Sequence, residues 1–344
     1  MATLYLIEQN TVLRKTSERL RLCRKPSRWD RSPGVRVGDI LLELPCTDID
    51  QVMLFGNVQV TTQALQQLLT HGIELSIFTL SGKLLGQLTP PKTKNIHLRI
   101  AQFEKHKDHG FIRKLGKKMV EAKIGNALAI LRQHRWNYPD IYSDDELNAI
   151  ENLMNRITLA ASLEQLRGLE GAATAAYFKL FGRMLNPPWQ FKTRTRRPPQ
   201  DPVNAVLSFG YVIVGSELQS LMDGVGFDPY LGYYHSIDYG RPSLALDLLE
   251  EFRHPLVDRL ALNLFNLNIL TENDFFSPPR GGVYLNISGK KKFFEHYEEM
   301  IGQYASASDL ADKPKSFRTI FQNQVHALAN TVQKGDIYKP FQIK

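Results

Sequence analysis

Residues 226–259 read GFDPYLGYYHSIDYGRPSLALDLLEEFRHPLVDR and join an aromatic loop, a turn and a strongly apolar helix. His235 follows the loop, and a Gly240-Arg241-Pro242 turn comes after it. The helix predicted beyond the turn carries three acids, Asp247, Glu250 and Glu251. One imidazole, several carboxylates and an arginine within about one supersecondary unit suggest a hard divalent cation and an anionic substrate.

The three acids of this helix have two interpretations. Asp247 lies three residues before Glu250 and four before Glu251, so on a helix they share a face and repel one another. The leucines around them put at least one acid near the core, where clustered acids need a cation. That cation is either a metal ion or one of three arginines, Arg241, Arg253 and Arg259. Spacing alone favours the ion-pair network, and Glu250 with His254 forms a competing pair of metal ligands.

The composition indicates a soluble globular protein large enough for two domains. The chain has 344 residues, of which 43% are hydrophobic and 23% are charged. Its two cysteines, Cys23 and Cys46, form neither a disulfide framework nor a zinc site, which fits a reducing cytoplasm. No secretory signal is visible, and no apolar stretch approaches the roughly 20 residues of a membrane span. We therefore expect a cytoplasmic location.

Positive charge is concentrated in one segment. The net charge is +8, and residues 91–135 hold 12 Lys or Arg against 3 Asp or Glu. A stripe of one sign attracts polyanions, although a solvated helix face would show the same pattern. The polar faces of the helices predicted here carry lysines that include Lys114, Lys117, Lys118 and Lys123. A second basic run, residues 192–197, reads either as an exposed loop that touches phosphates or as a mobile linker.

The hydrophobic periodicity changes at Pro90-Pro91, a pair that ends any helix and stiffens a linker. Before this pair we expect a helix at residues 64–69 and short strands at residues 4–7, 35–44, 52–55, 57–61 and 73–80. After it, apolar residues recur at helical spacing, and Ser143 to Glu146 reads as a helix cap. The sequence therefore predicts an α+β protein with a small N-terminal β-rich domain, residues 1–90, and a larger all-α domain, residues 91–344.

Short signatures of several enzyme classes are missing from the chain. It contains no G-x-x-x-x-G-K-[ST], no G-x-G-x-x-G, no H-E-x-x-H and no G-x-S-x-G. Nucleotide-driven motors, zincin proteases and serine hydrolases are thereby disfavoured.

Three stretches, in order and with matching spacing, resemble the signatures of the Cas1 family, the CRISPR adaptation integrases. They lie at residues 169–178, which begin LEGAA, at residues 226–235, and at residues 243–253. Residues 54–58 and 61–65 resemble the family's β-domain, and residues 282–285 and 338–341 resemble its C-terminal region. The likeness thus covers nearly the whole chain. Tyr233-Tyr234 departs from the pattern, which has an aliphatic residue at one of these positions.

Carried over by position, the family's catalytic metal ligands fall on Glu170, His235 and Glu250. Asp247 matches a nearby family carboxylate. Arg241 is expected to contact the scissile phosphate or to pair with Asp247 or Glu250, and Glu251 is expected to face solvent or an arginine. Oxygen-rich ligation with one imidazole suits Mg²⁺ or Mn²⁺ better than structural zinc.

The resemblance implies a reaction in which the 3′-hydroxyl of a DNA fragment attacks a phosphodiester at a CRISPR repeat boundary. With water as the nucleophile, the same site would act as a DNA endonuclease. The implied assembly is a homodimer, with residues 1–90 in the dimer contact, and two such dimers bridge a dimer of the small partner Cas2. Candidate contacts to the DNA backbone are Lys114, Lys117, Lys118, Arg194, Arg196 and Arg197, with Lys290-Lys291-Lys292 as a weaker candidate.

Two alternatives use the same residues. One is a non-catalytic nucleic-acid-binding scaffold, in which the acids only pair with arginines. The other is an RNA-processing nuclease, which would differ from the integrase only in its substrate.

Overall fold

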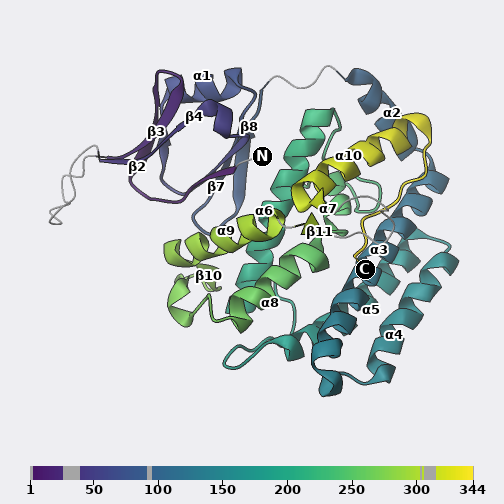
Figure 1. Ribbon diagram of the computed structural model, residues 1–344. Helices are drawn as coiled ribbons and strands as arrows, with labels where there is room; N and C mark the ends of the chain where they lie inside the picture. Colours follow the sequence, from purple (N-terminus) through teal and green to yellow (C-terminus); the bar gives the residue numbers. More distant parts are fainter. Residues whose placement is uncertain (1–2, 26–38, 91–94, 303, 306–314, 344) are drawn as a thin grey trace. The chain divides into compact units, whose positions relative to one another are not determined.

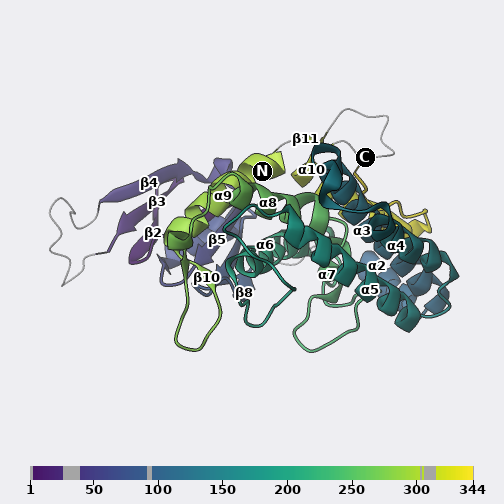
Figure 2. The ribbon, with the colours of Figure 1, turned by 90° about the horizontal axis from the view of Figure 1, so that it is seen from below.

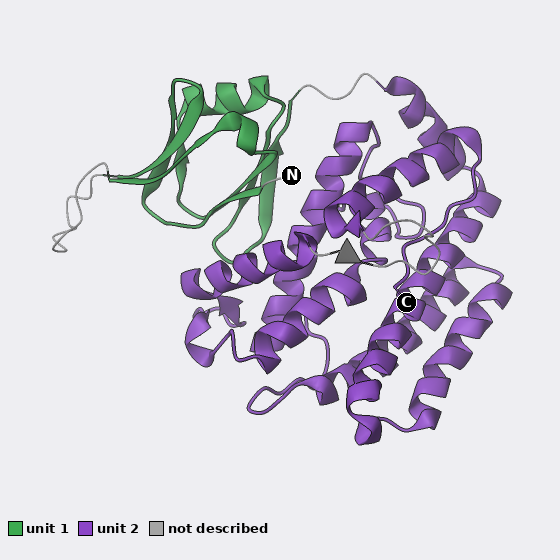
Figure 3. Ribbon diagram, viewed as in Figure 1, with its two compact units in different colours: residues 1–92 green, residues 93–344 purple. Residues whose placement is uncertain are grey.

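Strands and helices occupy different parts of the chain (Figure 1). The protein is described by a computed structural model that covers residues 3–25, 39–90, 95–302, 304–305 and 315–343. It divides into two compact units, residues 1–92 and 93–344 (Figure 3). Strands dominate the first unit and helices the second, which confirms the predicted α+β class.

Within its described residues, the first unit holds two four-stranded sheets. One sheet has the order β1 (Thr3–Leu6), β5 (Gln51–Phe55), β7 (Glu74–Phe78) and β8 (Leu84–Leu88), with only β8 antiparallel to its neighbour. The other has the order β4 (Ile40–Pro45), β3 (Arg19–Arg24), β2 (Thr11–Thr16) and β6 (Gln59–Val60). A helix, α1 (Thr62–Thr70), and a 3-10 turn, η1 (Cys46–Asp48), complete the unit. Its core is built from buried leucines, valines and isoleucines such as Leu13, Leu54 and Leu68.

The sequence does not predict β2, β3 or β8. In β2 and β3 the leucines stand beside Arg and Lys, and β8 contains Gly86, so none has the uninterrupted apolar character of β5. The strand predicted at residues 35–44 appears as β4 in its described part, and residues 35–38 lie outside the described residues. Pro91, the second residue of the predicted break, also lies outside them.

The second unit is built mainly from helices. Those of the described residues are α2 (Ile96–His106), α3 (His109–Asn137), α4 (Asp144–Asn155), α5 (Leu163–Phe181), α6 (Pro202–Val225), α7 (Ser243–Leu249), α8 (Arg259–Asn266), α9 (Ile287–Gly302) and α10 (Phe317–Lys334). Short 3-10 turns lie at η2 (Pro139–Ile141), η3 (Arg156–Leu159), η4 (Gly182–Met184) and η6 (Glu272–Asp274), and a π-helix, η5, spans Arg253–Asp258. Two antiparallel strand pairs join β9 (Phe275–Phe276) to β10 (Tyr284–Leu285) and β11 (Tyr304–Ala305) to β12 (Lys315–Ser316).

Side-chain caps fix where several of these helices begin. The predicted cap at Ser143 is present at the start of α4, where Ser143 and Glu146 form a capping box. Asp108, Ser162 and Asp201 accept a backbone amide at the starts of α3, α5 and α6. Each cap satisfies an N–H group that has no partner in the helix, which contributes about 1 kcal/mol.

The apolar helix α6 lies in the core of this unit and packs against α7 and α10. By length and composition alone it could cross a membrane, contrary to the expectation that no stretch approaches this length. However, 67% of its apolar window is buried inside the protein, which is typical of a core helix. At its end, Gly226 has a φ of +111°, a conformation that favours glycine, and turns the chain into the loop of residues 226–242.

The long helix α3 lies beside α4 and α5 on one flank of the helical unit (Figures 1 and 2). It also packs against α7 and the π-helix that follows. One helix therefore contacts both α5 and the segment beyond the loop of residues 226–242, and it brings stretches that are far apart in sequence together.

Candidate active site

Four elements deliver side chains to one cluster in the helical unit. Lys123 comes from α3, Glu170 from α5, His235 from the loop between α6 and α7, and Glu250 from the residue that ends α7. Lys123 and Glu250 are buried, whereas the side chains of Glu170 and His235 remain 21% and 17% exposed. The cluster is therefore accessible to solvent at Glu170 and His235. These four residues and Asp247 are called the acid–histidine cluster below.

The ammonium group of Lys123 bridges two carboxylates. It forms ion pairs with Glu170 and with Oε2 of Glu250, the latter at 2.7 Å. Thr174 also donates its hydroxyl to Oε1 of Glu170 at 3.0 Å. The prediction that Lys123 lies on a polar, solvated helix face is wrong, because its side chain is only 5% exposed. The signal that could have revealed this is its helical spacing from Met119 and Ala127, which belong to the apolar face of α3.

Close packing of the loop on the start of α7 sets the path of the chain towards the histidine. A Cβ atom on Gly232 would lie 2.6 Å from the Cβ of Ser243, so this approach requires glycine. Leu244 donates its amide to the carbonyl of Pro229, and the Ser243 hydroxyl donates to the carbonyl of Ser236, both at 2.9 Å. These bonds hold the loop on the first turn of α7.

Asp247 holds this loop and the His235 ring at the same time. Its Oδ1 accepts the His235 amide and pairs with His235 Nδ1, both at 2.7 Å. Its Oδ2 accepts the amides of Tyr233 and Tyr234 at 2.6 and 3.0 Å. Because an ionised carboxylate only accepts, it favours a proton on Nδ1 and leaves the lone pair on Nε2. That nitrogen lies 3.7 Å from Oε1 of Glu250.

The Tyr233-Tyr234 departure from the family pattern leaves this arrangement intact, since both side chains are buried and both amides bind Asp247. Arg167, which sequence reasoning does not single out, donates from α5 to the Tyr234 carbonyl at 2.8 Å. Its guanidinium also lies over the Tyr234 ring, 5.9 Å from the centroid. Arg167 therefore ties the loop to the helix that carries Glu170.

Arg253 is the second cation at Glu250. Its Nε lies 3.0 Å from Oε1 of Glu250, and its guanidinium lies 4.6 Å from the centroid of the Tyr211 ring. Burial alone would raise the pKa of Glu250, but Arg253 and Lys123 outweigh it and hold that pKa below its usual value. Glu250 is therefore ionised at neutral pH. Among the described residues, Arg241 pairs with neither Asp247 nor Glu250, so that alternative is not observed.

Glu251 belongs to a different environment, and the expectation that it faces solvent or an arginine is wrong. It is fully buried and accepts hydrogen bonds from Gln324, from the Tyr338 hydroxyl and from the Phe341 amide, at 2.8, 2.5 and 2.7 Å. Burial raises the pKa of Glu251 to about 7. The reason for the difference is tertiary, because the partners of Glu251 come from α10 and from the C-terminal segment.

The same C-terminal segment is tied to α3. Asn126, one turn beyond Lys123, donates to the carbonyls of Glu251 and Phe341 at 2.8 and 3.0 Å. It also accepts the amide of Ile343 at 2.9 Å. Lys123 and Asn126, one turn apart on α3, therefore contact Glu250 and Glu251, the two neighbouring glutamates at the end of α7.

The alternative ligand pair of Glu250 and His254 is not formed. Glu250 lies before the π-helix of residues 253–258, and its carboxylate pairs with Lys123 and Arg253 instead. His254 is buried, pairs through Nδ1 with Asp258 at 2.7 Å and packs its ring against Tyr177. Asp258 also accepts the hydroxyls of Tyr177 and Tyr211. It therefore fixes the Tyr211 ring, over which the Arg253 guanidinium lies.

The basic residues predicted to contact DNA differ in their surroundings, and their role stays a prediction. Lys114, Arg196 and Arg197 are exposed. Lys117 donates to the Thr158 carbonyl at 2.6 Å, and Lys118 pairs with Glu121 at 3.2 Å.

Two of the basic candidates are tied into the protein. Arg194 donates to Asn204 and Ser208 at 2.7 and 2.9 Å and lies over the Tyr211 ring. Lys290, the first residue of the weaker candidate run, is buried and donates to the carbonyl of Leu285. The exposed positions are therefore the better candidates for DNA contacts.

The acid–histidine cluster has donors that suit a divalent metal ion. Two carboxylates and an imidazole nitrogen are ligands that Mg²⁺ and Mn²⁺ accept. The Lys123 ammonium already occupies a cationic position between Glu170 and Glu250. In the described part of the chain, no three His, Cys, Asp or Glu side chains stand close enough to hold a metal, because this ammonium separates the two glutamates. The donor set therefore fits such an ion if Lys123 releases the carboxylates.

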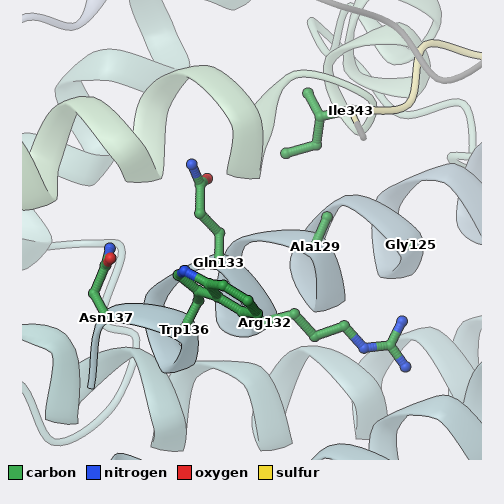
Figure 4. Close-up of a pocket in the computed structure, with 7 residues that line it drawn as sticks. All are labelled: Gly125, Ala129, Arg132, Gln133, Trp136, Asn137 and Ile343. Atoms are coloured by element: carbon green, nitrogen blue, oxygen red, sulfur yellow. The ribbon is translucent and has the colours of Figure 1, made fainter. Parts of the chain in front are cut away.

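A separate hollow lies beside the second half of α3 (Figure 4). Its lining residues are Gly125, Ala129, Arg132, Gln133, Trp136, Asn137 and Ile343. No residue of the acid–histidine cluster lines it, so it is a different feature of the surface.

These observations define a class of protein, an α+β chain whose helical unit gathers two glutamates and a histidine around a buried cation. Residues 4–299 match the model of the family described as CRISPR associated protein Cas1. The chain is 30% identical over 346 aligned positions to CRISPR-associated endonuclease Cas1 3 of Thermus thermophilus, covering 100% of this chain and 98% of that relative. The chain therefore belongs to the Cas1 family, which confirms the resemblance seen in its motifs.

Solved structures share the fold. A casposase bound to integration product has a TM-score of 0.86 at 22% identity and covers 99% of this chain and 93% of that chain. A chain of a Cas6-RT-Cas1–Cas2 complex has a TM-score of 0.79 at 24% identity and covers 100% of this chain but 36% of that longer chain. Both similarities extend over the strand-rich and the helical parts of the protein.

Proposed function

We propose that this protein inserts DNA fragments at CRISPR repeats by metal-dependent strand transfer, and that it cleaves DNA when water replaces the attacking hydroxyl. The observation that carries the proposal is the convergence of Glu170, His235 and Glu250 from separate segments on one partly exposed cluster. Membership of the Cas1 family supports it. The endonuclease name of the Thermus relative and the casposase structure with its integration product point to the same chemistry.

Glu170, His235 and Glu250 would hold a Mg²⁺ or Mn²⁺ ion. When bound, such an ion lowers the pKa of the attacking hydroxyl or water and offsets the charge that builds on the phosphate. Asp247 keeps the His235 proton on Nδ1, so that Nε2 stays available as a ligand. Arg253, stacked on Tyr211, keeps the Glu250 carboxylate fixed and ionised.

The DNA backbone would approach from the side on which Glu170 and His235 are partly exposed. Near Glu170 on α5, the exposed residues include Gly171, Ala172 and Ala175, whose small side chains leave room for a substrate. We assign Arg241, on the loop after His235, to the scissile phosphate. The exposed Lys114, Arg196 and Arg197 would contact phosphates without reading sequence.

The proposed assembly follows the resemblance. The protein would act in the cytoplasm as a homodimer, with residues 1–90 in the dimer contact, and two dimers would bridge a Cas2 dimer. The shared fold of a chain in the Cas6-RT-Cas1–Cas2 complex supports the Cas2 part of this proposal.

An integration assay on a supercoiled plasmid that bears a CRISPR repeat tests the function. Wild-type protein with Cas2 is expected to join a DNA fragment only when Mg²⁺ or Mn²⁺ is added. Glu170→Ala, His235→Ala and Glu250→Ala are each expected to reduce strand transfer by at least about a hundredfold, since each removes a ligand. Glu164→Ala, an exposed acid in the first turn of α5, is the matched control. Normal joining by all three variants would contradict the proposal.

One observation favours a second candidate, the non-catalytic DNA-binding scaffold. Lys123 and Arg253 already pair with the acids, as in the ion-pair network that spacing alone favours. A scaffold predicts no DNA processing and no thermal stabilisation by Mn²⁺. The integrase predicts DNA processing, and it also predicts thermal stabilisation by Mn²⁺. An ion that binds only the folded state raises the melting temperature. Thermal unfolding of the wild type and of Glu250→Gln, with and without Mn²⁺, separates the two.

A further inference from the structure

Lys123 is a buried cation that the proposed chemistry leaves without a role. Its side chain is 5% exposed, and its ammonium pairs with both Glu170 and Glu250. A buried ammonium is costly unless it is paired, and neighbouring carboxylates repel each other unless a cation lies between them. Lys123 and the two glutamates therefore stabilise one another when no metal ion is present.

We propose that Lys123 is a built-in counter-cation, which holds Glu170 and Glu250 in place without metal and opposes the binding of a divalent ion between them. The inference rests on the proposed function, because it takes the two glutamates as ligands of that ion. Metal binding would then require the ammonium to release at least one carboxylate. Lys123 would thus set the metal concentration at which the DNA-cutting site becomes active.

The contacts distinguish Lys123 from the other cation at the site. Lys123 contacts Oε1 of Glu170 and Oε2 of Glu250, whereas Arg253 contacts Oε1 of Glu250. Arg253 is also held by stacking on Tyr211, whose hydroxyl is bound to Asp258. The Lys123 ammonium sits at the end of a flexible four-carbon chain and carries a compact charge. Lys123 is therefore the cation that can yield, and Arg253 is the one that stays.

The charges give the direction of the effect. An incoming divalent ion needs the carboxylate oxygens that Lys123 occupies, and it is repelled by an ammonium that remains nearby. A single cation within about 4–6 Å changes the ionisation equilibrium of a carboxyl group by a factor of about ten or more, and a charge effect of this order is expected on a metal ion at the same site. Removal of the ammonium should therefore tighten metal binding and, at the same time, destabilise the metal-free protein.

Mn²⁺ binding to Lys123→Met, followed by electron paramagnetic resonance of free Mn²⁺, tests the proposal. Methionine keeps an unbranched apolar chain and removes the charge. We expect the Kd for Mn²⁺ to fall by at least about tenfold relative to wild type, and the melting temperature without metal to fall. Lys290→Met is the matched control, because Lys290 is equally buried in the same unit and donates to a backbone carbonyl. It should leave the Kd unchanged.

Further variants make the outcomes decisive. Adding Glu250→Gln to Lys123→Met should abolish the tight binding, which would assign it to this cluster. Lys123→Gln provides the same measurement should Lys123→Met fail to fold, and folding of Lys123→Met only in the presence of Mn²⁺ would support the proposal.

Two results would overturn the inference. An unchanged or higher Kd in the Lys123 variants, with wild type binding Mn²⁺ in a Glu250-dependent way, would overturn it and leave the proposed function intact. Absence of Glu250-dependent Mn²⁺ binding from both the wild type and the Lys123 variants would overturn both.

Discussion

Each carboxylate oxygen of Asp247 accepts from two N–H groups, and this arrangement leaves no place for a donor. In Asp247→Asn the amide nitrogen would face two N–H groups whichever way the side chain is turned. We expect Mn²⁺ affinity and strand transfer to fall by about 10–100-fold. The free energy of unfolding in urea should fall by about 1–3 kcal/mol. Asp238→Asn, an exposed acid of the same loop, is the control, and equal effects of both changes would refute the orienting role of Asp247.

Sequence reasoning finds the acids of the cluster and misses its cation. His235, Asp247 and Glu250 lie in one short segment, but spacing alone does not separate a metal site from an ion-pair network. Glu170 stands out on its alanine-rich helix, but its role as a ligand comes only from the family motif, because it lies on another helix. Lys123 is overlooked because the lysines before it suggest a solvated stripe, and its burial depends on acids that other segments bring to it.

The packing of α6 against α9 places a titrating acid in the core, where Glu217 accepts the Tyr297 hydroxyl at 3.0 Å. Burial raises the pKa of Glu217 to about 7, against an ordinary value of 4.5, and Arg318 offsets part of this effect. The folded state therefore binds the proton more tightly than the unfolded state. Stability is lost as the pH rises from about 4.5 to about 7, by about 3 kcal/mol in total.

Glu217→Gln keeps an acceptor for Tyr297 and removes this titration. We expect the variant to be more stable than wild type by up to about 3 kcal/mol at pH 8, and to match it near pH 4. Urea unfolding across this pH range measures the difference. A slope of stability against pH that is identical in the two proteins would show that Glu217 does not titrate in this way. Buried Glu251, whose pKa is also about 7, should leave both proteins with a residual slope of the same sign.

Elements with a continuous local signal are the ones that the sequence predicts. The capping box of α4 and the apolar periodicity of α3 are local, and both helices are present. Strands β2 and β3 are missed because each is short and holds two or three charged residues, so neither contains an apolar run like that of β5. The π-helix at Arg253–Asp258 is also invisible to a rule based on 3.6 residues per turn. The Glu250–His254 pair fails because His254 pairs with Asp258, whereas Glu250 pairs with Lys123 and Arg253.

The excess of positive charge should appear as salt-dependent DNA binding. The triple variant Lys114→Glu, Arg196→Glu, Arg197→Glu is expected to weaken binding of every DNA sequence alike. It should also reduce the slope of log K against log salt by about 0.9 for each phosphate contact that is lost. Fluorescence anisotropy at salt concentrations from about 50 to about 200 mM measures this slope. Lys83→Glu, an exposed lysine of the first unit, is the control, and an unchanged slope in the triple variant would place the phosphate contacts elsewhere.

The division into a strand-rich and a helical part can be predicted because hydrophobic periodicity changes near the Pro90-Pro91 pair. The family can be predicted because three motifs keep their order and spacing. The interior contacts of the helical unit cannot, since the partners of Glu251 come from α10 and from residues beyond it, and no local pattern of either segment reveals them.

The hydrogen bonds of Asn126 join residues that are 125 and 215 positions apart along the chain. Contacts between such distant residues form late in folding, because loop-closure entropy must be lost before they are made. During synthesis the helices can form as they emerge, but Glu251 lacks its Tyr338 and Phe341 partners until the last described residues have left the ribosome. The neighbouring Glu250 does not wait for this segment, because its partners Lys123 and Arg253 are made earlier. The buried carboxylate of Glu251 is therefore among the last groups of the helical unit to gain its partners during synthesis.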